Sequence, residues 1–315
     1  MTVLNYLISR SLPFVPRSVV RIFSRRYIAG DSLEEAVRVL RGLNGEGYMA
    51  TLDVLGEEVD RRDLADAAVR EYQRALSVIH HERLDSSVSI KLTQLGLKID
   101  FEFCLANVRA LVLAARDLGN FVRIDMEDSS CTTPTLDLYR RLRGEGLDNV
   151  GVVLQACLRR TLEDARSLPG GSNVRLCKGI YVEPRTIAYR NRGVVNKNYA
   201  RVLEDLIDRG HYVGIATHDE DLVWEAMRLI DEKRLARDRY EFQMLLGVDE
   251  ELRGLIRKAG HRMRVYVPYG PHWYAYSVRR LKENPSIAGY VVANLLGRRA
   301  GAPETRVAPR GTRPP

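Results

Sequence analysis

The chain has 315 residues, 45% of them hydrophobic, and a formal net charge of +8 at pH 7. A chain of this length can bury a substantial core, so we exclude disorder of the whole chain. Residues 1–30 carry five Arg and no acid, for +5, and residues 298–315 carry five Arg and one Glu, for +4, which leaves about −1 for the body between them. An electrically balanced body disfavours a nucleic-acid groove, so we expect no nucleic-acid partner.

The cysteines and histidines predict neither disulfides nor a metal site. The four Cys form no C-x-x-C pair, and the six His show no metal-ligand spacing such as H-E-x-x-H. The first apolar run is interrupted by Arg10 and Pro13, well short of the ~20 apolar residues that span a bilayer. We therefore expect a cytoplasmic protein with reduced thiols, no metal and no membrane-spanning segment.

The elements expected along the chain alternate between strands and helices. Residues 1–46 are predicted as an N-terminal helical arm, with helices at 2–12, 17–27 and 32–43. Strands are predicted at 48–54, 87–92, 121–126, 150–156, 173–179, 212–217, 240–245 and 263–268. Helical patterns follow them at 60–81, 101–117, 133–143, 160–167, 196–209, 219–235, 249–259 and 272–283.

Eight strand–helix units within ~250 residues have the size and order of a closed barrel. We therefore predict the α/β class, with a (β/α)8 TIM-type barrel over residues 47–297 and an N-terminal helical arm. A doubly wound open sheet is the alternative. Residues 298–315 are basic and poor in apolar residues, which predicts a disordered tail.

Polar residues stand at the end of every predicted strand, where a barrel carries its functional groups. Lys91 is the sharpest case, because an unpaired ammonium in a barrel core is costly and needs an anion. Either a structural partner such as Asp125 or a substrate carboxylate would satisfy it. The other strand-end residues are Asp53, Glu57, Asp125, Glu127, Asp128, Gln155, Arg175, Lys178, Thr217, His218, Gln243, Tyr266 and Tyr269.

Two further features bear on chemistry. Arg279 and Arg280 are adjacent, with Glu283 at helical spacing to steady both, and such a pair suits a carboxylate or phosphate, although a solvated basic face is the alternative. Lys178 also permits a second function, that of a Schiff-base lyase.

The only match to a dinucleotide fingerprint, at residues 45–50, precedes its strand and is read as a turn. Any nucleotide cofactor must then be held by the barrel itself.

Nine motifs together resemble the proline dehydrogenase family, and they occur in the family order. They are LDVLGE (52–57), SIKL (89–92), DMED (125–128), VLQA (153–156), VRLCKGIYVEP (174–184), ATHDE (216–220), YEFQMLLG (240–247), RVYVPYG (264–270) and YSVRRLKEN (276–284). The resemblance implies a distorted (β/α)8 barrel that binds FAD and oxidises L-proline to Δ1-pyrroline-5-carboxylate.

The same resemblance implies roles for individual residues. Lys91, Arg279 and Arg280 would clamp the proline carboxylate, and Asp125 and Arg175 would act at the reacting centre, with Asp125 ordering the site and Arg175 approaching the reactive flavin nitrogen. Glu57 and Arg279 would form a gate. The proline ring would be enclosed by Tyr181, Leu245, Tyr266 and Tyr276. FAD would be held by Met126, Gln155, Arg175, Cys177, Lys178, Gly179, Ile180, Thr217, His218 and Gln243, with Glu283 nearby.

Small departures from the family pattern touch the flavin side of the site. Cys177 and Ile180 stand where the family commonly has Val and Ala. Tyr266 favours proline over hydroxyproline, because a bulky phenol leaves little room for a ring hydroxyl.

The resemblance also implies a quinone as the electron acceptor. Residues 17–27 form a basic amphipathic pattern suited either to an anionic membrane surface, which would place the protein peripherally at the inner face of the cell membrane, or to packing on the barrel. The rival functions are the lyase and a non-catalytic binding module that uses the basic ends. The sequence leaves the oligomeric state open.

Overall fold

The structure is a computed structural model, and it describes residues 20–21, 24–274 and 276–277. The chain divides into two compact units. Arg26–His272 form one, and Met1–Arg25 with Trp273–Pro315 form the other. All helices and strands named below belong to Arg26–His272, which we call the barrel unit.

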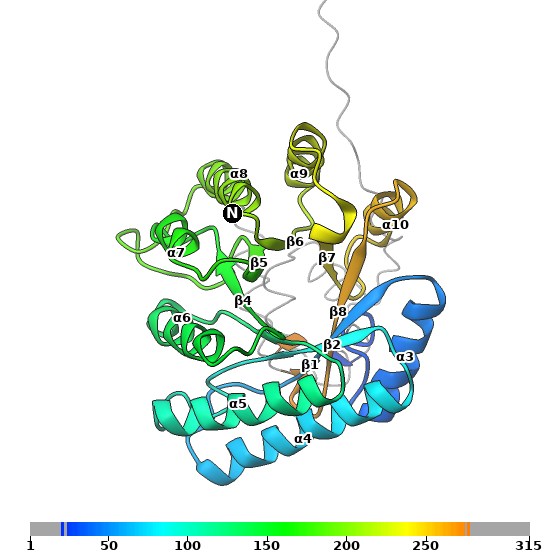
Figure 1. Ribbon diagram of the computed structural model, residues 1–315. Helices are drawn as coiled ribbons and strands as arrows, with labels where there is room; N and C mark the ends of the chain where they lie inside the picture. The colour runs from blue at the N-terminus through cyan, green and yellow to red at the C-terminus, as the bar shows by residue number, and fades with distance from the viewer. Residues whose placement is uncertain (1–19, 22–23, 275, 278–315) are drawn as a thin grey trace, which may run out of the picture. The chain divides into compact units, whose positions relative to one another are not determined.

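Eight parallel strands close into a barrel in which each strand pairs with its neighbours in sequence and β8 pairs with β1 (Figure 1). The pairing of β1 with β8 aligns Leu52 with Val267, and this contact excludes the open doubly wound sheet. The strands are β1 Met49–Val54, β2 Ser86–Ile90, β3 Val122–Ile124, β4 Val150–Gln155, β5 Asn173–Cys177, β6 Tyr212–Ala216, β7 Tyr240–Leu245 and β8 Met263–Tyr269.

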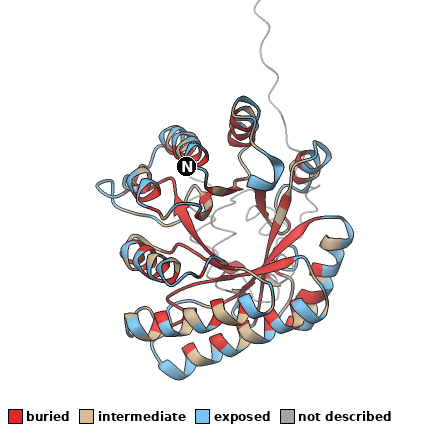
Figure 2. Cartoon of the chain, viewed as in Figure 1, coloured by how far each residue is buried: buried red, intermediate tan, exposed pale blue. Residues whose placement is uncertain are grey.

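The helices form a ring outside the strands (Figure 1). Figure 2 shows that their buried residues face the barrel and their exposed residues face away from it. They are α3 Leu33–Gly45, α4 Arg62–His81, α5 Phe101–Asp117, α6 Ser129–Gly144, α7 Thr161–Arg166, α8 Arg192–Asp208, α9 Glu220–Glu232, the short 3-10 helix η2 Arg237–Arg239, and α10 Glu250–Lys258.

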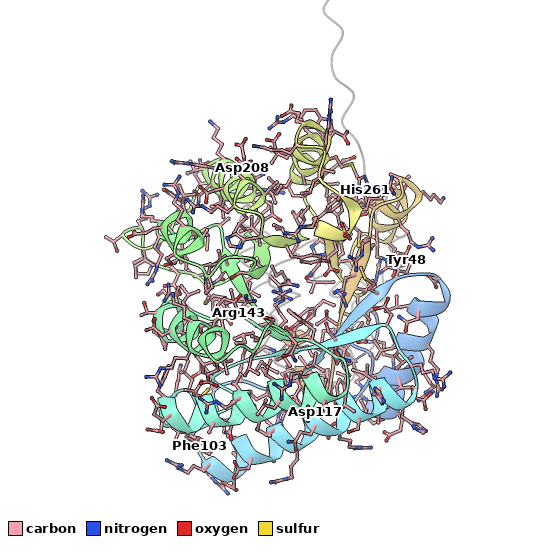
Figure 3. The ribbon with its side chains drawn as sticks, in the orientation of Figure 1. Tyr48, Phe103, Asp117, Arg143, Asp208 and His261 are labelled. Carbon is pink, nitrogen blue, oxygen red and sulfur yellow. The ribbon has the colours of Figure 1, made fainter. Side chains whose placement is uncertain are left out.

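The helices begin where their sequences provide caps. The Ser32 hydroxyl accepts a hydrogen bond from the Glu35 backbone, and the Glu35 carboxylate accepts one from the Ser32 backbone, which forms a capping box at α3. Asp100 caps α5 through the backbone nitrogen of Phe103. Tyr48, labelled in Figure 3, precedes β1 and lies under the guanidinium of Arg253, 4.9 Å from its ring centroid. The caps fix where α3 and α5 begin, and the stacked Arg253 holds α10 against the segment before β1.

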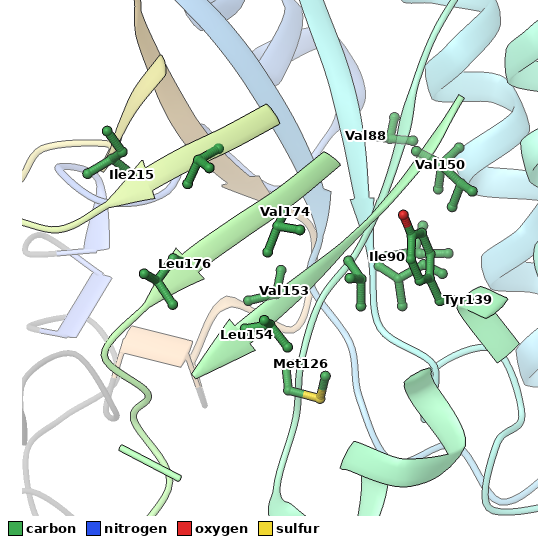
Figure 4. Close-up of a cluster of buried hydrophobic side chains, with 14 of the residues drawn as sticks. Val88, Ile90, Met126, Tyr139, Val150, Val153, Leu154, Val174, Leu176 and Ile215 are labelled. Atoms are coloured by element: carbon green, nitrogen blue, oxygen red, sulfur yellow. The ribbon is translucent and has the colours of Figure 1, made fainter. Parts of the chain in front are cut away.

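The outward faces of the strands are apolar and form the core with the helices. Val88, Ile90, Val150, Val174 and Ile215 are fully buried there (Figure 4). Burial of this large apolar surface is the main favourable contribution to the stability of the fold.

The inward faces are mostly polar, whereas a TIM barrel interior is usually filled by bulky branched side chains. Side chains from strands that are not neighbours meet inside the barrel, as Arg123 of β3 does with Asn173 of β5. Gly151 of β4 lies beneath Arg123, and a side chain at that position would collide with the guanidinium. Polar residues therefore alternate with apolar ones along each strand because one face lines the interior and the other meets the helices.

The predicted (β/α)8 barrel and all eight predicted strands are confirmed. The structure's β3 is shorter than the predicted strand at 121–126, although the Asp125 backbone still donates to Ile90, at 2.8 Å. The helix predicted at 32–43 is α3, which contacts β1 and β8 within the barrel unit. The helix predicted at 2–12 and the tail at 298–315 lie outside the described residues. In the part of the chain that the structure describes, no helix is long and apolar enough to cross a bilayer.

Candidate active site

Asp125 is the centre of a buried polar cluster at the carboxyl ends of the strands. One carboxylate oxygen accepts hydrogen bonds from Ser89 of β2 and, at 2.8 Å, from Nη2 of Arg175 of β5. The other accepts the phenol of Tyr266 of β8 at 2.7 Å. Side chains from three separate strands thus converge on a carboxylate that directly follows β3.

Lys91 lies beside this cluster, and its ammonium donates to Asp53 of β1 at 2.6 Å. Burial disfavours the charged amine, but the carboxylates of Asp53 and Asp125 outweigh that cost and raise the pKa of Lys91. Burial raises the pKa of Asp53 despite the facing ammonium. The anion that the sequence required for Lys91 is therefore Asp53, and the suggested Asp125 contributes at longer range.

Arg175 and Tyr266 stack above one another inside the barrel. The guanidinium carbon lies 5.0 Å from the phenol ring centroid. Burial and the neighbouring carboxylates raise the pKa of Tyr266 well above its usual range. For Arg175, burial favours the neutral form, but Asp125 outweighs it and raises the pKa. The pair therefore presents a fixed cation beside a neutral phenol.

A second polar cluster surrounds Lys178, which follows β5. Its ammonium forms an ion pair with Asp219, the residue before α9. Asp219 also accepts hydrogen bonds from Arg192 at 3.0 Å and Asn196 at 3.1 Å, both from α8. Burial opposes ionisation of Asp219, but these three donors outweigh it and lower its pKa. The cluster joins the ends of β5 and β6 to two helices.

Gln155 and Glu127 connect the ends of β4 and β3. The Gln155 amide donates to the backbone carbonyl of Glu127 at 2.8 Å. The Glu127 carboxylate accepts from the backbone nitrogen of Thr93 at 3.0 Å and from its hydroxyl. Burial raises the pKa of Glu127 in spite of these bonds.

Several other predicted site residues lie at the same end of the barrel. Nε2 of His218 accepts from the Leu245 backbone at 2.9 Å, and the Thr217 hydroxyl accepts from the Asp219 backbone at 3.0 Å. Met126 is buried after β3 (Figure 4), and Cys177, Gly179, Ile180 and Tyr181 follow one another from the end of β5. Ile180 is exposed and Tyr181 half-buried.

The structure describes three further predicted residues in other surroundings. Gln243 of β7 lies inside the barrel and donates to Glu241 at 2.6 Å. Glu57 is exposed in the loop after β1. Tyr276 is buried in the second unit. Arg279, Arg280 and Glu283 lie outside the described residues, so their predicted roles stay predictions.

Sequence reasoning singled out no role for Ser89, Asp219, Glu241 or Arg264. Glu241 and Arg264 form a buried ion pair at 2.7 Å inside the barrel. The signal was the alternation of charged with apolar residues inside strands that are buried on both faces. Within the described part of the chain, no three His, Cys, Asp or Glu side chains are grouped to hold a metal.

Comparisons with known proteins identify the family of the chain. The family model described as Proline dehydrogenase matches residues 36–292. The chain is 36% identical to proline dehydrogenase 1 of Bacillus subtilis subsp. natto over 277 residues, which cover 88% of this chain and 91% of that protein. It is also 36% identical to the proline dehydrogenase of Deinococcus radiodurans over 278 residues, which cover 87% and 90%.

A solved structure is similar to the same region. Proline utilization A (PutA) from Bdellovibrio bacteriovorus, inactivated by N-propargylglycine, has a TM-score of 0.78 and 25% sequence identity. The match covers 87% of this chain but 34% of that one, so the chain corresponds to about a third of PutA. The chain therefore belongs to the proline dehydrogenase family of enzymes.

Proposed function

We propose that this chain oxidises L-proline to Δ1-pyrroline-5-carboxylate with FAD as the hydride acceptor and a quinone as the next electron acceptor. As a member of its family, the chain is an oxidoreductase of proline catabolism. The observation that carries the finer proposal is the buried cluster of Lys91, Asp125, Arg175 and Tyr266 at the carboxyl end of the barrel, where such enzymes place their chemistry.

Lys91 has the donors to bind the substrate carboxylate. An ammonium carries three N–H donors, and among the described residues that of Lys91 donates to Asp53 alone. Its other donors are available to the carboxylate of proline. We propose that Arg279 and Arg280 complete the clamp, that Glu57 and Arg279 gate it, and that Tyr181, Leu245, Tyr266 and Tyr276 enclose the ring.

The residues at the ends of β4, β5 and β6 fit a flavin. The Gln155 amide nitrogen is occupied by Glu127, which leaves its carbonyl oxygen as an acceptor. Gly179 has a φ of +95°, and a side chain there would collide with Cys157, so the backbone is bare at this point. Lys178 adds a cation for a phosphate. We propose that FAD is held by Met126, Gln155, Arg175, Cys177, Lys178, Gly179, Ile180, Thr217, His218, Gln243 and Glu283.

FAD, when bound, supplies the acceptor for the hydride that proline loses from the carbon next to its ring nitrogen. The protein's part is positioning, because an anchored carboxylate fixes the orientation of the ring. Asp125 holds Arg175 and Tyr266 in place through its two oxygens. The fixed positive charge of Arg175 would stabilise negative charge on a flavin held beside it.

The visible absorbance spectrum of the purified protein, before and after anaerobic addition of L-proline, tests the proposal. We expect a flavin spectrum that bleaches with proline. A Lys91→Met variant should keep the flavin spectrum but require far more proline to bleach it. A flavin spectrum that proline leaves unchanged would exclude proline as the substrate. A protein that cannot be reconstituted with FAD would exclude FAD as the cofactor.

The alternative function is a Schiff-base lyase that uses Lys178. A Schiff-base lysine must act as a free amine, whereas Asp219 holds this ammonium in an ion pair. Borohydride in the presence of substrate should therefore trap no covalent adduct. An adduct at Lys178 would establish the lyase.

We also propose that the basic segment at residues 17–27 brings the enzyme to the inner face of the cell membrane, where quinones reside. Its charge supports this proposal, because clustered Arg side chains are attracted to anionic lipid. The full chain should sediment with anionic liposomes, and a version lacking residues 1–30 should not. Equal sedimentation of the two would refute the membrane role.

A further inference from the structure

A cavity of about 250 Å³ lies inside the barrel at the amino ends of the strands, opposite the candidate active site. Its outer lining includes Phe121, Asn173, Tyr212 and Arg262, which begin or precede β3, β5, β6 and β8. At roughly 30 Å³ per water, it has room for about eight waters. That is enough for a small hydrated ion and too little for a nucleotide.

The lining carries more positive than negative charge. Four guanidiniums line the cavity, those of Arg123, Arg175, Arg262 and Arg264, and the one carboxylate in the lining is Glu241. Glu241 pairs with Arg264, and Asp125 above the cavity pairs with Arg175. Within the described ranges, Arg123 and Arg262 have no carboxylate partner. The cavity therefore has two uncompensated positive charges.

Arg123 is buried in this cavity and is held in a fixed position. Its Nη1 donates to the backbone carbonyls of Val152 at 3.1 Å and Asn173 at 2.7 Å, and its Nη2 donates to the Asn173 side chain. Burial, with the repulsion of Arg175, lowers the pKa of Arg123 to about 10, so it remains charged at neutral pH. A buried cation without a counter-charge is costly, and an anion beside it would remove the cost.

Two other donors are free to contribute. Arg262 is half-exposed at the mouth, where its contacts are the sulfur of Met49 at 3.4 Å and the ring of Tyr212 at 6.0 Å. The Nε of Arg175 is buried, and it has no hydrogen-bond partner in the part of the chain that the structure describes. A guanidinium suits planar, bidentate recognition of oxyanions.

We propose that this cavity binds a small divalent oxyanion of the phosphate class, with Arg262 at the mouth and Arg123 in the interior as its charged ligands. Two uncompensated guanidiniums match the two charges of such an ion. The cavity shares Arg175 and Gln243 with the proposed flavin site, but its charged ligands Arg123 and Arg262 have no role in the flavin or proline sites, so a variant at Arg262 tests it independently of them.

Titration calorimetry with inorganic phosphate tests the proposal, using the full chain saturated with FAD in chloride buffer at constant ionic strength. We expect saturable binding of one phosphate. Arg262→Gln should weaken it about tenfold or more, which corresponds to the loss of one charge-assisted contact. Arg70→Gln, an exposed position on α4, changes the net charge equally and should bind like the unaltered protein.

Three results would overturn the proposal. The first is the absence of saturable binding at millimolar phosphate. The second is an equal loss of affinity in the Arg262 and Arg70 variants, which would show a general effect of net charge. The third is binding that Arg262→Gln leaves unchanged while phosphate releases FAD into the filtrate, because the ion would then occupy the flavin site. Equal affinity for sulfate would support the same class of ligand.

Discussion

Lys91 and Asp53 form an ion pair that is almost entirely removed from water, with side-chain exposures of 10% and 1%. A buried pair of this kind contributes little to stability as a unit, but either partner left alone is costly. The pair therefore keeps an ammonium charged and oriented in the barrel at a small net cost.

Lys91→Met should lower the free energy of unfolding by about 3–5 kcal/mol, because it leaves the Asp53 carboxyl buried without its ammonium partner. The double variant Lys91→Met/Asp53→Asn should recover most of that loss. Urea unfolding at neutral pH measures both, and the cycle is completed by Asp53→Asn alone. Strictly additive effects would show that the two side chains are not coupled.

The same double variant separates folding from substrate binding. It should be nearly as stable as the unaltered protein and still require far more proline to bleach the flavin. Restored reduction by proline would place the carboxylate clamp elsewhere.

Glycines within the elements differ in what surrounds them. Gly214 of β6 faces the interior, where an added Cβ would lie 2.5 Å from Nε2 of Gln243. Gly254 of α10 has open space around it. The first glycine is required by packing, and the second is not.

Gly214→Ala should destabilise the protein by about 1–3 kcal/mol through overpacking. Gly254→Ala should stabilise it by about 0.5–1 kcal/mol, because alanine loses less conformational freedom in a helix. Thermal unfolding of the two variants measures opposite shifts of the midpoint. Shifts of the same sign would contradict the assignment of their surroundings.

Asp219 joins β5, α8 and α9, and its role should appear as a dependence of stability on pH. Its folded-state pKa is lower than the ordinary value of 3.8, so between the two values the unfolded chain binds more protons than the folded one. The stability that Asp219 contributes is therefore present above 3.8 and is lost as the pH falls through the window below it.

Asp219→Asn should lower the free energy of unfolding by about 1–2 kcal/mol at neutral pH, the range for a partly solvated network of charged hydrogen bonds. The difference from the unaltered protein should be smaller at about pH 3, because unfolding then takes up a proton on Asp219 that the folded state does not bind. Urea unfolding at both pH values measures it. A difference that does not change with pH would assign the effect to packing instead of charge.

Across the whole barrel unit, stability and chemistry lie on opposite faces of the same strands. Leu52 of β1 is fully buried against the helices, and its neighbour Thr51 lies inside, with its hydroxyl 3.2 Å from that of Ser87. Leu52→Ala should cost about 2–5 kcal/mol through lost apolar burial and a cavity. Thr51→Ala should cost about 1 kcal/mol, the value of one hydrogen bond. Urea unfolding ranks the two, and equal costs would contradict this division.

The sequence was sufficient to predict the barrel, because strand and helix periodicities depend on local patterns. The sequence also predicted that Lys91, Arg175 and Tyr266 come together, since parallel strands bring their carboxyl ends together, and Arg175 and Tyr266 both donate to Asp125. The sequence could not identify the partner of Lys91, because the partner depends on which acidic side chain of the two neighbouring strands lies level with the ammonium. Asp53 lies in β1 and Asp125 directly follows β3, the two strands that flank β2, so the pairing order alone leaves both carboxylates within reach of Lys91.

Part of the polar interior could also be predicted from the sequence. Alternating polar residues in β2, β7 and β8 distinguish these strands from the apolar runs usual in a parallel sheet. The cavity that they line depends on glycines such as Gly151, which make room for long side chains of other strands. That relation joins residues far apart in the chain, so local patterns do not contain it.

The alternation of the two faces limits how the length of this chain can change. Insertion or deletion of a single residue within a strand would turn every later side chain of that strand over, placing charges against the helices and aliphatic groups in the interior. The same change in a loop between elements moves no strand. Variation in length is therefore expected to collect in the loops, and the eight strands should keep a fixed number of residues even where their side chains are exchanged.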